Sequence, residues 1–115
     1  MAAGLHSIVE TPEFARSAAS VLTEAERTAL IVYLASDPLA GEVMQGTGGA
    51  RKLRWGAKGK GKSGGARVIT FYAGLDMPLF LLAIFGKNEK ANLSKSERNE
   101  LRELLADIVR AYRRD

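Results

Sequence analysis

The residues of this sequence that could carry chemistry are concentrated in one basic segment. Between Glu42 and Asp76 the chain has no acidic residue, but it has seven basic ones: Arg51, Lys52, Arg54, Lys58, Lys60, Lys62 and Arg67. The remaining ten of the chain's 17 Lys and Arg residues are outnumbered by its 13 Asp and Glu residues. A concentrated positive segment on an acidic body is typical of proteins that bind a polyanion such as a nucleic acid, although an acidic protein partner also fits.

The spacing of these cations predicts a phosphate-binding surface. Lys52 and Arg54 alternate with Leu53 and Trp55 at the strand period, so the two cations share one face and the two apolar side chains point to the core. Arg67 lies beside them if the glycine-rich loop over residues 56–65 closes a hairpin. Within that loop, three lysines would follow a phosphate backbone as a flexible charged finger, namely Lys58, Lys60 and Lys62. A solvated loop with no ligand is the alternative.

Residues 56–63 also match the phosphate-loop pattern G-x-x-x-x-G-K-[ST]. That pattern binds nucleotide triphosphates only where the Lys-Ser pair opens a helix, whose N-terminal amides hold the phosphates. Here Ser63 is followed by Gly64-Gly65 and then by a segment with strand character. We therefore do not expect this protein to bind a nucleotide triphosphate.

A second candidate group follows the most apolar segment of the chain. Lys87, Asn88 and Glu89 leave its C-terminal end, where side chains can converge on the edge of a sheet. A polar connection between a strand and a helix is an equally good interpretation of these residues. His6 is expected to belong to the first strand or its edge, and Tyr72 to the core or the sheet surface, although its ring could stack on a base.

Composition limits the remaining possibilities. We expect residues 1–115 to form a single domain, because each of two domains of half that length would bury too little apolar surface to be stable. The absence of cysteine excludes disulfides, thiolate metal sites and thiol catalysis, and a lone histidine disfavours a histidine-built metal site. No apolar run reaches the roughly 20 residues of a membrane span, and no secretory signal is evident. The expected location is the cytoplasm.

The first half of the chain predicts a strand and two helices. Residues 6–9 have strand character, and Thr11-Pro12 is an N-cap followed by proline at the first helical position. The apolar residues of that helix are Phe14, Ala18, Val21 and Leu22. A capping box at Thr23 and Glu26 starts a second helix that runs to about residue 35, and the two helices are expected to form a hairpin.

The second half predicts three strands and a helix. The strands are expected over residues 52–55, 67–72 and 79–85, the last buried on both faces because it is apolar throughout. Ser94 and Glu97 form another capping box, which opens a C-terminal helix. Its apolar stripe contains Leu101, Leu104, Leu105, Ile108 and Tyr112. The order β-α-α-β-β-β-α predicts an α+β domain with an antiparallel-rich sheet, an N-terminal helical hairpin and a C-terminal helix.

Three segments in this order resemble a known family. They are residues 45–54 (QGTGGARKLR), residues 58–69 (KGKGKSGGARVI) and residues 85–89 (FGKNE), with two helices before them and one after. Together they resemble the toxins of the RelE/ParE superfamily, specifically the HigB-like branch, over nearly the whole chain.

The resemblance implies a type II toxin–antitoxin toxin with a small RelE-like domain. Such toxins are ribosome-dependent mRNA endoribonucleases, or mRNA interferases, that inhibit translation without a metal or another cofactor. They cleave by attack of the 2′-hydroxyl on the adjacent phosphate. The implied partners are the ribosome, mRNA and a cognate helix-turn-helix antitoxin of the HigA type, with autorepression of the operon.

The resemblance also implies roles for individual residues. Arg67 matches the phosphate-clamping arginine, and Lys52 and Arg54 match a basic pair on the preceding strand. Asn88 lies where some relatives carry a second active-site arginine, so that role passes to Lys87. Relatives with a C-terminal tyrosine as base have Leu93 or Ser94 at that place here. The general base is therefore unassigned; Glu89 is the first candidate and a lysine with a lowered pKa is the second.

Two other functions stay open at this point. One is a noncatalytic toxin that inhibits a protein such as DNA gyrase, as the ParE side of the superfamily does. The other is an RNA-binding module without cleavage, which would show salt-dependent RNA affinity but no cut products. The basic loop and the 86–89 segment favour the nuclease, because inhibition of gyrase does not need a phosphate-cleaving cluster.

Overall fold

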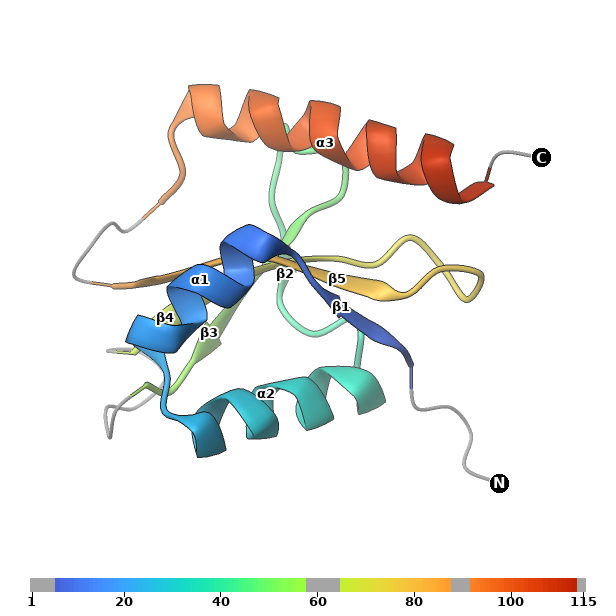
Figure 1. Cartoon of the computed structure of the whole chain (residues 1–115). Helices are drawn as coiled ribbons and strands as arrows, with labels where there is room; N and C mark the ends of the chain where they lie inside the picture. Colours follow the sequence, from blue (N-terminus) through green and yellow to red (C-terminus); the bar gives the residue numbers. More distant parts are fainter. Residues whose placement is uncertain (1–5, 58–64, 88–91, 114–115) are drawn as a thin grey trace.

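The chain folds into a five-stranded mixed sheet with helices on both faces (Figure 1). The computed structural model describes residues 6–57, 65–87 and 92–113. The strand order across the sheet is β1-β5-β4-β3-β2, in which β1 pairs parallel with β5 and every other pair is antiparallel. The elements along the chain are β1 (Ile8–Glu10), α1 (Pro12–Val21), α2 (Glu24–Ser36), β2 (Glu42–Val43), β3 (Arg51–Trp55), β4 (Ala66–Phe71), β5 (Leu79–Gly86) and α3 (Lys95–Arg113).

Each helix begins where its capping residues predict. The Thr11 hydroxyl accepts the backbone N–H of Phe14, with Pro12 at the first position of α1. Thr23 and Glu26 make both hydrogen bonds of the capping box at the start of α2. Ser94 and Glu97 do the same before α3. Local hydrogen bonding therefore fixes the start of all three helices, because these bonds satisfy N–H groups that have no partner within the helix.

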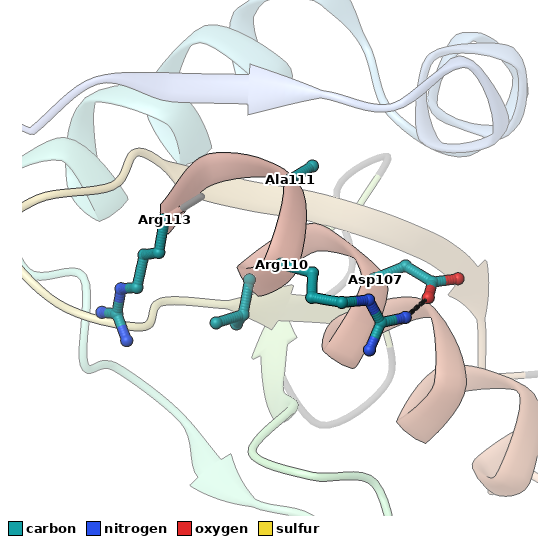
Figure 2. A pocket seen from close by; sticks show the side chains of 5 residues that line it. Asp107, Arg110, Ala111 and Arg113 are labelled. Atoms are coloured by element: carbon teal, nitrogen blue, oxygen red, sulfur yellow. Dashed lines mark hydrogen bonds and ion pairs between the residues drawn. The ribbon is translucent and has the colours of Figure 1, made fainter. Parts of the chain in front are cut away.

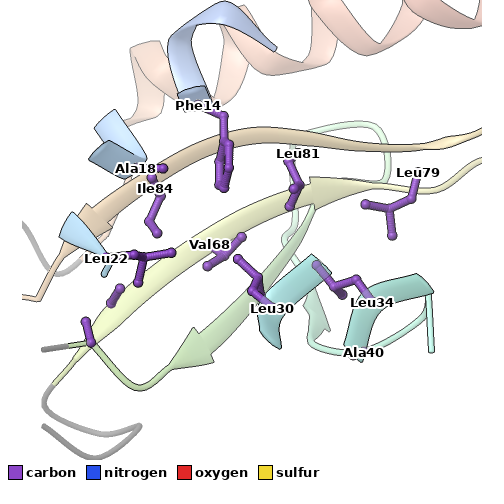
Figure 3. Close-up of a cluster of buried hydrophobic side chains, with 12 residues drawn as sticks. Phe14, Ala18, Leu22, Leu30, Leu34, Ala40, Val68, Leu79, Leu81 and Ile84 are labelled. Carbon is purple, nitrogen blue, oxygen red and sulfur yellow. The ribbon is translucent and has the colours of Figure 1, made fainter. Parts of the chain in front are cut away.

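One face of the sheet is covered by α1 and α2. Phe14 of α1 and Leu30 and Leu34 of α2 are fully buried against Val68 and Leu81 of the sheet (Figure 3). Leu53 and Trp55 pack against the same cluster, which confirms that they point away from the basic face. The Trp55 ring donates its Nε1–H to the Glu26 carbonyl and so is a structural residue.

The opposite face is covered by α3, and less completely (Figure 1). Leu105 is the residue of α3 that is buried, whereas Leu101 and Ile108 are half-buried. Of the expected five-residue stripe, Tyr112 is 52% exposed but still packs its ring edge to face on Phe80, and Leu104 is 43% exposed. Val109, which the sequence did not place on the stripe, also packs on the cluster, and Leu104 is partly in solvent.

The α+β fold class is confirmed, with one strand more than the sequence predicts. The additional strand is β2, whose two residues pair with Arg51 and Lys52. Two residues are too few for any periodicity to be recognised, so this strand exists only through its pairing. The burial of β5 on both faces is confirmed, since it lies between β1 and β4 and six of its eight residues are buried. A register shift opposite Ile69 and Thr70 places both Leu82 and Ala83 of β5 on the α3 face.

Candidate functional site

The β3–β4 pairing brings the three sequence-predicted cations of the strands together. Arg54 and Arg67 are direct register partners, and Lys52 is two residues before Arg54 on the same face. Arg54 is exposed, and Lys52 and Arg67 are half-buried. Because like charges directly opposite on neighbouring strands repel each other, this arrangement costs folding free energy unless an anion lies between them. A phosphate would supply that negative charge and accept the planar forks of both guanidinium groups.

These cations line a pocket of about 500 Å³ on the α3 face of the sheet, lined by Gly41, Glu42, Lys52, Leu53, Arg54, Arg67 and Asn92. One wall depends on a close approach of backbone. Gly41 has a φ of 95°, and a Cβ at this position would lie 2.7 Å from the Lys52 carbonyl oxygen. A glycine is therefore needed here for the chain before β2 to lie against β3 and close that wall.

Two residues of this pocket were missed at the level of sequence. Asn92 accepts a hydrogen bond from Lys52 Nζ at 2.8 Å, which fixes the ammonium group in the pocket. Glu42 is the register partner of Lys52 across β2 and β3 and is the carboxylate that lines the pocket. Glu42 is the last acidic residue before the segment without acids, and this position is visible in the sequence. Its pairing with Lys52 was not predictable, because it depends on strand β2. The hydrogen bond of Asn92 spans 40 residues and leaves no local signal.

Of the other predicted site residues, the structure describes Lys87. Lys87 is exposed after the end of β5, where its backbone N–H donates to the Gly65 carbonyl, and it does not line the pocket. Lys58, Lys60, Lys62, Asn88 and Glu89 lie outside the described residues, so their roles stay predictions. The segment that follows the phosphate-loop match becomes strand β4 from Ala66, which is not the helix that such a loop requires.

His6 and Tyr72 lie together away from these cations. The Tyr72 hydroxyl is 3.4 Å from His6 Nδ1, and the two rings meet edge to face. The backbone N–H of His6 donates to Ala35, and Tyr72 packs against the core under α1 and α2. Both therefore have structural contacts, as the sequence predicts.

A second hollow, of about 680 Å³, lies beside the C-terminal half of α3 (Figure 2). Its arginines already have anionic partners, since Arg110 pairs with Asp107 and Arg113 donates to both carboxylate oxygens of Asp76 at 2.9 and 3.0 Å. The hydrogen bond from Arg113 lowers the pKa of Asp76, and the same contact raises the pKa of Arg113. The arginines of this hollow therefore bind carboxylates of the protein itself.

The comparison with protein families agrees with this geometry. The sequence model of the RelE toxin of the RelE/RelB toxin–antitoxin system matches residues 10–115. The chain belongs to the RelE toxin family. It is a toxin of a toxin–antitoxin system, and an antitoxin is its partner. Toxins of this family generally inhibit translation by cutting mRNA, and a pocket that concentrates cations is what a phosphodiester substrate requires.

In the described part of the chain, no helix is long and apolar enough to span a membrane. Nor do three or more His, Asp or Glu side chains of these ranges come together in a way that could hold a metal ion.

Proposed function

We propose that this RelE-family toxin is an mRNA interferase that cleaves message on the ribosome. The observation that carries the proposal is the convergence of Lys52, Arg54 and Arg67 in one pocket of a chain whose family generally cuts mRNA. Scattered cations would support RNA binding alone, whereas three in one pocket can hold a single phosphate from several sides. The HigB-like branch of the family is part of the same proposal.

The proposed reaction is an internal transesterification. The ribose 2′-oxygen attacks the adjacent phosphorus, the bond from phosphorus to the 5′-oxygen of the next nucleotide breaks, and a 2′,3′-cyclic phosphate and a 5′-hydroxyl result. Negative charge accumulates on the nonbridging oxygens as the fifth bond to phosphorus forms. Arg54 and Arg67 would stabilise this charge, which is the largest contribution that such a site can make without a cofactor.

The reaction also needs a base for the 2′-hydroxyl proton and an acid for the leaving 5′-oxygen. Glu42 is the carboxylate that lines the pocket, and we propose it as a base beside Glu89, the candidate from sequence. Lys52, the register partner of Glu42, would donate the proton to the leaving oxygen. Lys87 and Asn88 stay proposed contributors from the end of β5, and Lys58, Lys60 and Lys62 stay proposed contacts to the RNA backbone.

Dependence on the ribosome is part of the same proposal. A phosphate bound by the pocket cations must still be brought into the in-line geometry that the attack needs. The ribosome would supply that orientation, which can lower the barrier by about 7–11 kcal/mol when it is complete. We further propose a HigA-like helix-turn-helix antitoxin that represses the operon together with the toxin.

The decisive experiment maps mRNA 5′ ends in a reconstituted translation reaction, with and without ribosomes. Arg67→Ala should lower the cleavage rate by about 100-fold or more, because it removes charge stabilisation from the transition state. Arg16→Ala is the matched control, since Arg16 is exposed on α1 and lies outside the pocket. Comparison of Glu42→Gln with Glu89→Gln assigns the base.

The outcomes separate the competing functions. Cuts with 5′-hydroxyl ends that appear only on translated message support the interferase. Cuts on free RNA reject the dependence on the ribosome, and retained RNA affinity without cuts indicates a binding module. A folded, toxic protein that cuts nothing, and whose toxicity survives Arg67→Ala, would overturn the nuclease in favour of a gyrase-type inhibitor.

A further inference from the structure

A groove lies on the α3 face of the sheet, lined by residues of the first turn of α1, of the sheet and of the N-terminal half of α3. Its volume is about 170 Å³. Ile69 and Ala83 of the sheet form the floor, and the exposed Leu104 forms part of one wall. This groove thus exists because α3 leaves one side of its apolar stripe uncovered.

Carboxylates surround this apolar floor. Glu13 comes from α1, and Glu97 and Glu100 come from α3. Glu97 accepts the backbone N–H of Ser94 in the capping box and so has a structural role. Glu13 and Glu100 have neither a hydrogen bond nor an ion pair within the described ranges. The groove therefore offers negative charge above an apolar surface, the reverse of the neighbouring pocket.

The size and charge of the groove indicate what it can bind. Its volume is well below the roughly 300–1,000 Å³ of pockets for small organic ligands, so it suits a single side chain. Lysine and arginine combine an aliphatic stem with a cationic head, and they bury the stem on apolar surface while the head stays with polar groups. A phosphodiester chain, in contrast, would be repelled by three carboxylates.

We propose that this groove receives a lysine or arginine side chain of the antitoxin. The stem would lie on Ile69 and against Leu104, and the cationic head would bind the carboxylates of Glu13 and Glu100. That the partner is an antitoxin is inferred from the family match. That the bound side chain is lysine or arginine is inferred from the charge and volume of the groove.

The groove adjoins the pocket of Lys52, Arg54 and Arg67, so an antitoxin bound in the groove would also affect access to that pocket. Ile69 is the register partner of Lys52 and lies two residues from Arg67 on the same strand and face. Asn92 of the phosphate-binding pocket is followed directly by Leu93 of the groove. An antitoxin segment anchored in the groove would lie against the pocket and exclude an RNA backbone from it. This consequence rests on the proposed function, whereas the contact itself does not.

The test measures the affinity of the purified toxin for the antitoxin expressed from the reading frame that adjoins the toxin gene, by calorimetry and without RNA. The double variant Glu13→Gln/Glu100→Gln should weaken binding by about 10- to 100-fold, the usual effect of losing charge-assisted hydrogen bonds. Glu103→Gln is the control for overall charge, because it removes one negative charge from an exposed position of α3 outside the groove. Leu104→Ala should weaken binding several-fold through the lost contact with the stem.

Antitoxin affinity within about threefold of the parent for both the double variant and Leu104→Ala would overturn the proposal. An equal loss in Glu103→Gln would also overturn it, because the effect would then be one of overall charge. If the double variant keeps its antitoxin affinity but loses mRNA cleavage, the groove belongs to the RNA site. A protein that cuts no RNA can still show the expected affinities, so failure of the proposed function is recognised separately.

Discussion

The two faces of the sheet are built on different principles. The face under α1 and α2 is closed by large apolar side chains, and Phe14, Leu30 and Leu34 have no exposed surface. The face under α3 is only partly closed, since Leu105 is the buried residue of that helix and Leu104 is in solvent. Both the basic pocket of Lys52, Arg54 and Arg67 and the acidic groove lie on this second face.

Polar contacts hold α3 where apolar packing is thin. Arg98 donates to the Gln45 carbonyl near the beginning of the helix, and Arg113 bridges to Asp76 and the Ala73 carbonyl at its end. Lys52 reaches Asn92 just before the helix starts. Contacts of this kind at exposed positions contribute little free energy each but fix an orientation. The comparison indicates that the face under α1 and α2 supplies stability, whereas the face under α3 keeps polar groups accessible.

Truncation of the closed face should have the largest effect on stability. Phe14→Ala should lower the free energy of unfolding by about 3–5 kcal/mol, because it leaves a cavity under α1. Leu104→Ala, on the partly open face, should change it by less than about 1 kcal/mol. Urea unfolding followed by circular dichroism measures both, and comparable losses would show that the two faces do not differ in this way.

Substitutions of two buried threonines are expected to change the stability by intermediate amounts. Thr70 is fully buried, and its hydroxyl has no hydrogen-bond partner in the described part of the chain. Thr70→Val should therefore stabilise the protein by about 1 kcal/mol, because an unsatisfied hydroxyl no longer has to be buried.

Thr47 is the matched control for this substitution. It is equally buried, but its hydroxyl donates to the Met44 carbonyl and accepts the Ala50 N–H. Thr47→Val should destabilise the protein by about 1–3 kcal/mol, because it leaves both backbone groups without their partner. Thermal unfolding of the two variants should shift in opposite directions, and a loss of stability in Thr70→Val would contradict the interpretation.

The smallest expected effect concerns the end of α3. Because Arg113 lowers the pKa of Asp76, the pair stabilises the folded state when the carboxylate is ionised, and this contribution disappears as the pH falls through the lowered pKa. Asp76→Asn should thus be slightly less stable than the parent near pH 6, and the difference should vanish near about pH 2. Thermal unfolding across this range measures it; a difference that grows on acidification would contradict the assignment.

Much of the fold was predictable because its signals are local. Capping boxes and an N-terminal proline mark where helices start, and the alternation over residues 52–55 distinguishes the basic face of β3 from its apolar face. Arg67 was expected beside Lys52 and Arg54 on the condition that β3 and β4 pair, and they do pair, with Arg67 opposite Arg54. The strand β2 and the exposure of Leu104 and Tyr112 were not predictable, because both depend on how distant segments pack.

The sequence by itself determined which residues are available for chemistry and on which strand faces they lie, because charge and strand periodicity are properties of short segments. Only the tertiary structure decided that Glu42 and Asn92 join Lys52 in one pocket, through pairings that cross 10 and 40 residues. It also decided that α3 covers the sheet incompletely and leaves an acidic groove beside a basic pocket. Contacts between distant segments depend on the packing of the whole domain, and no local pattern encodes them.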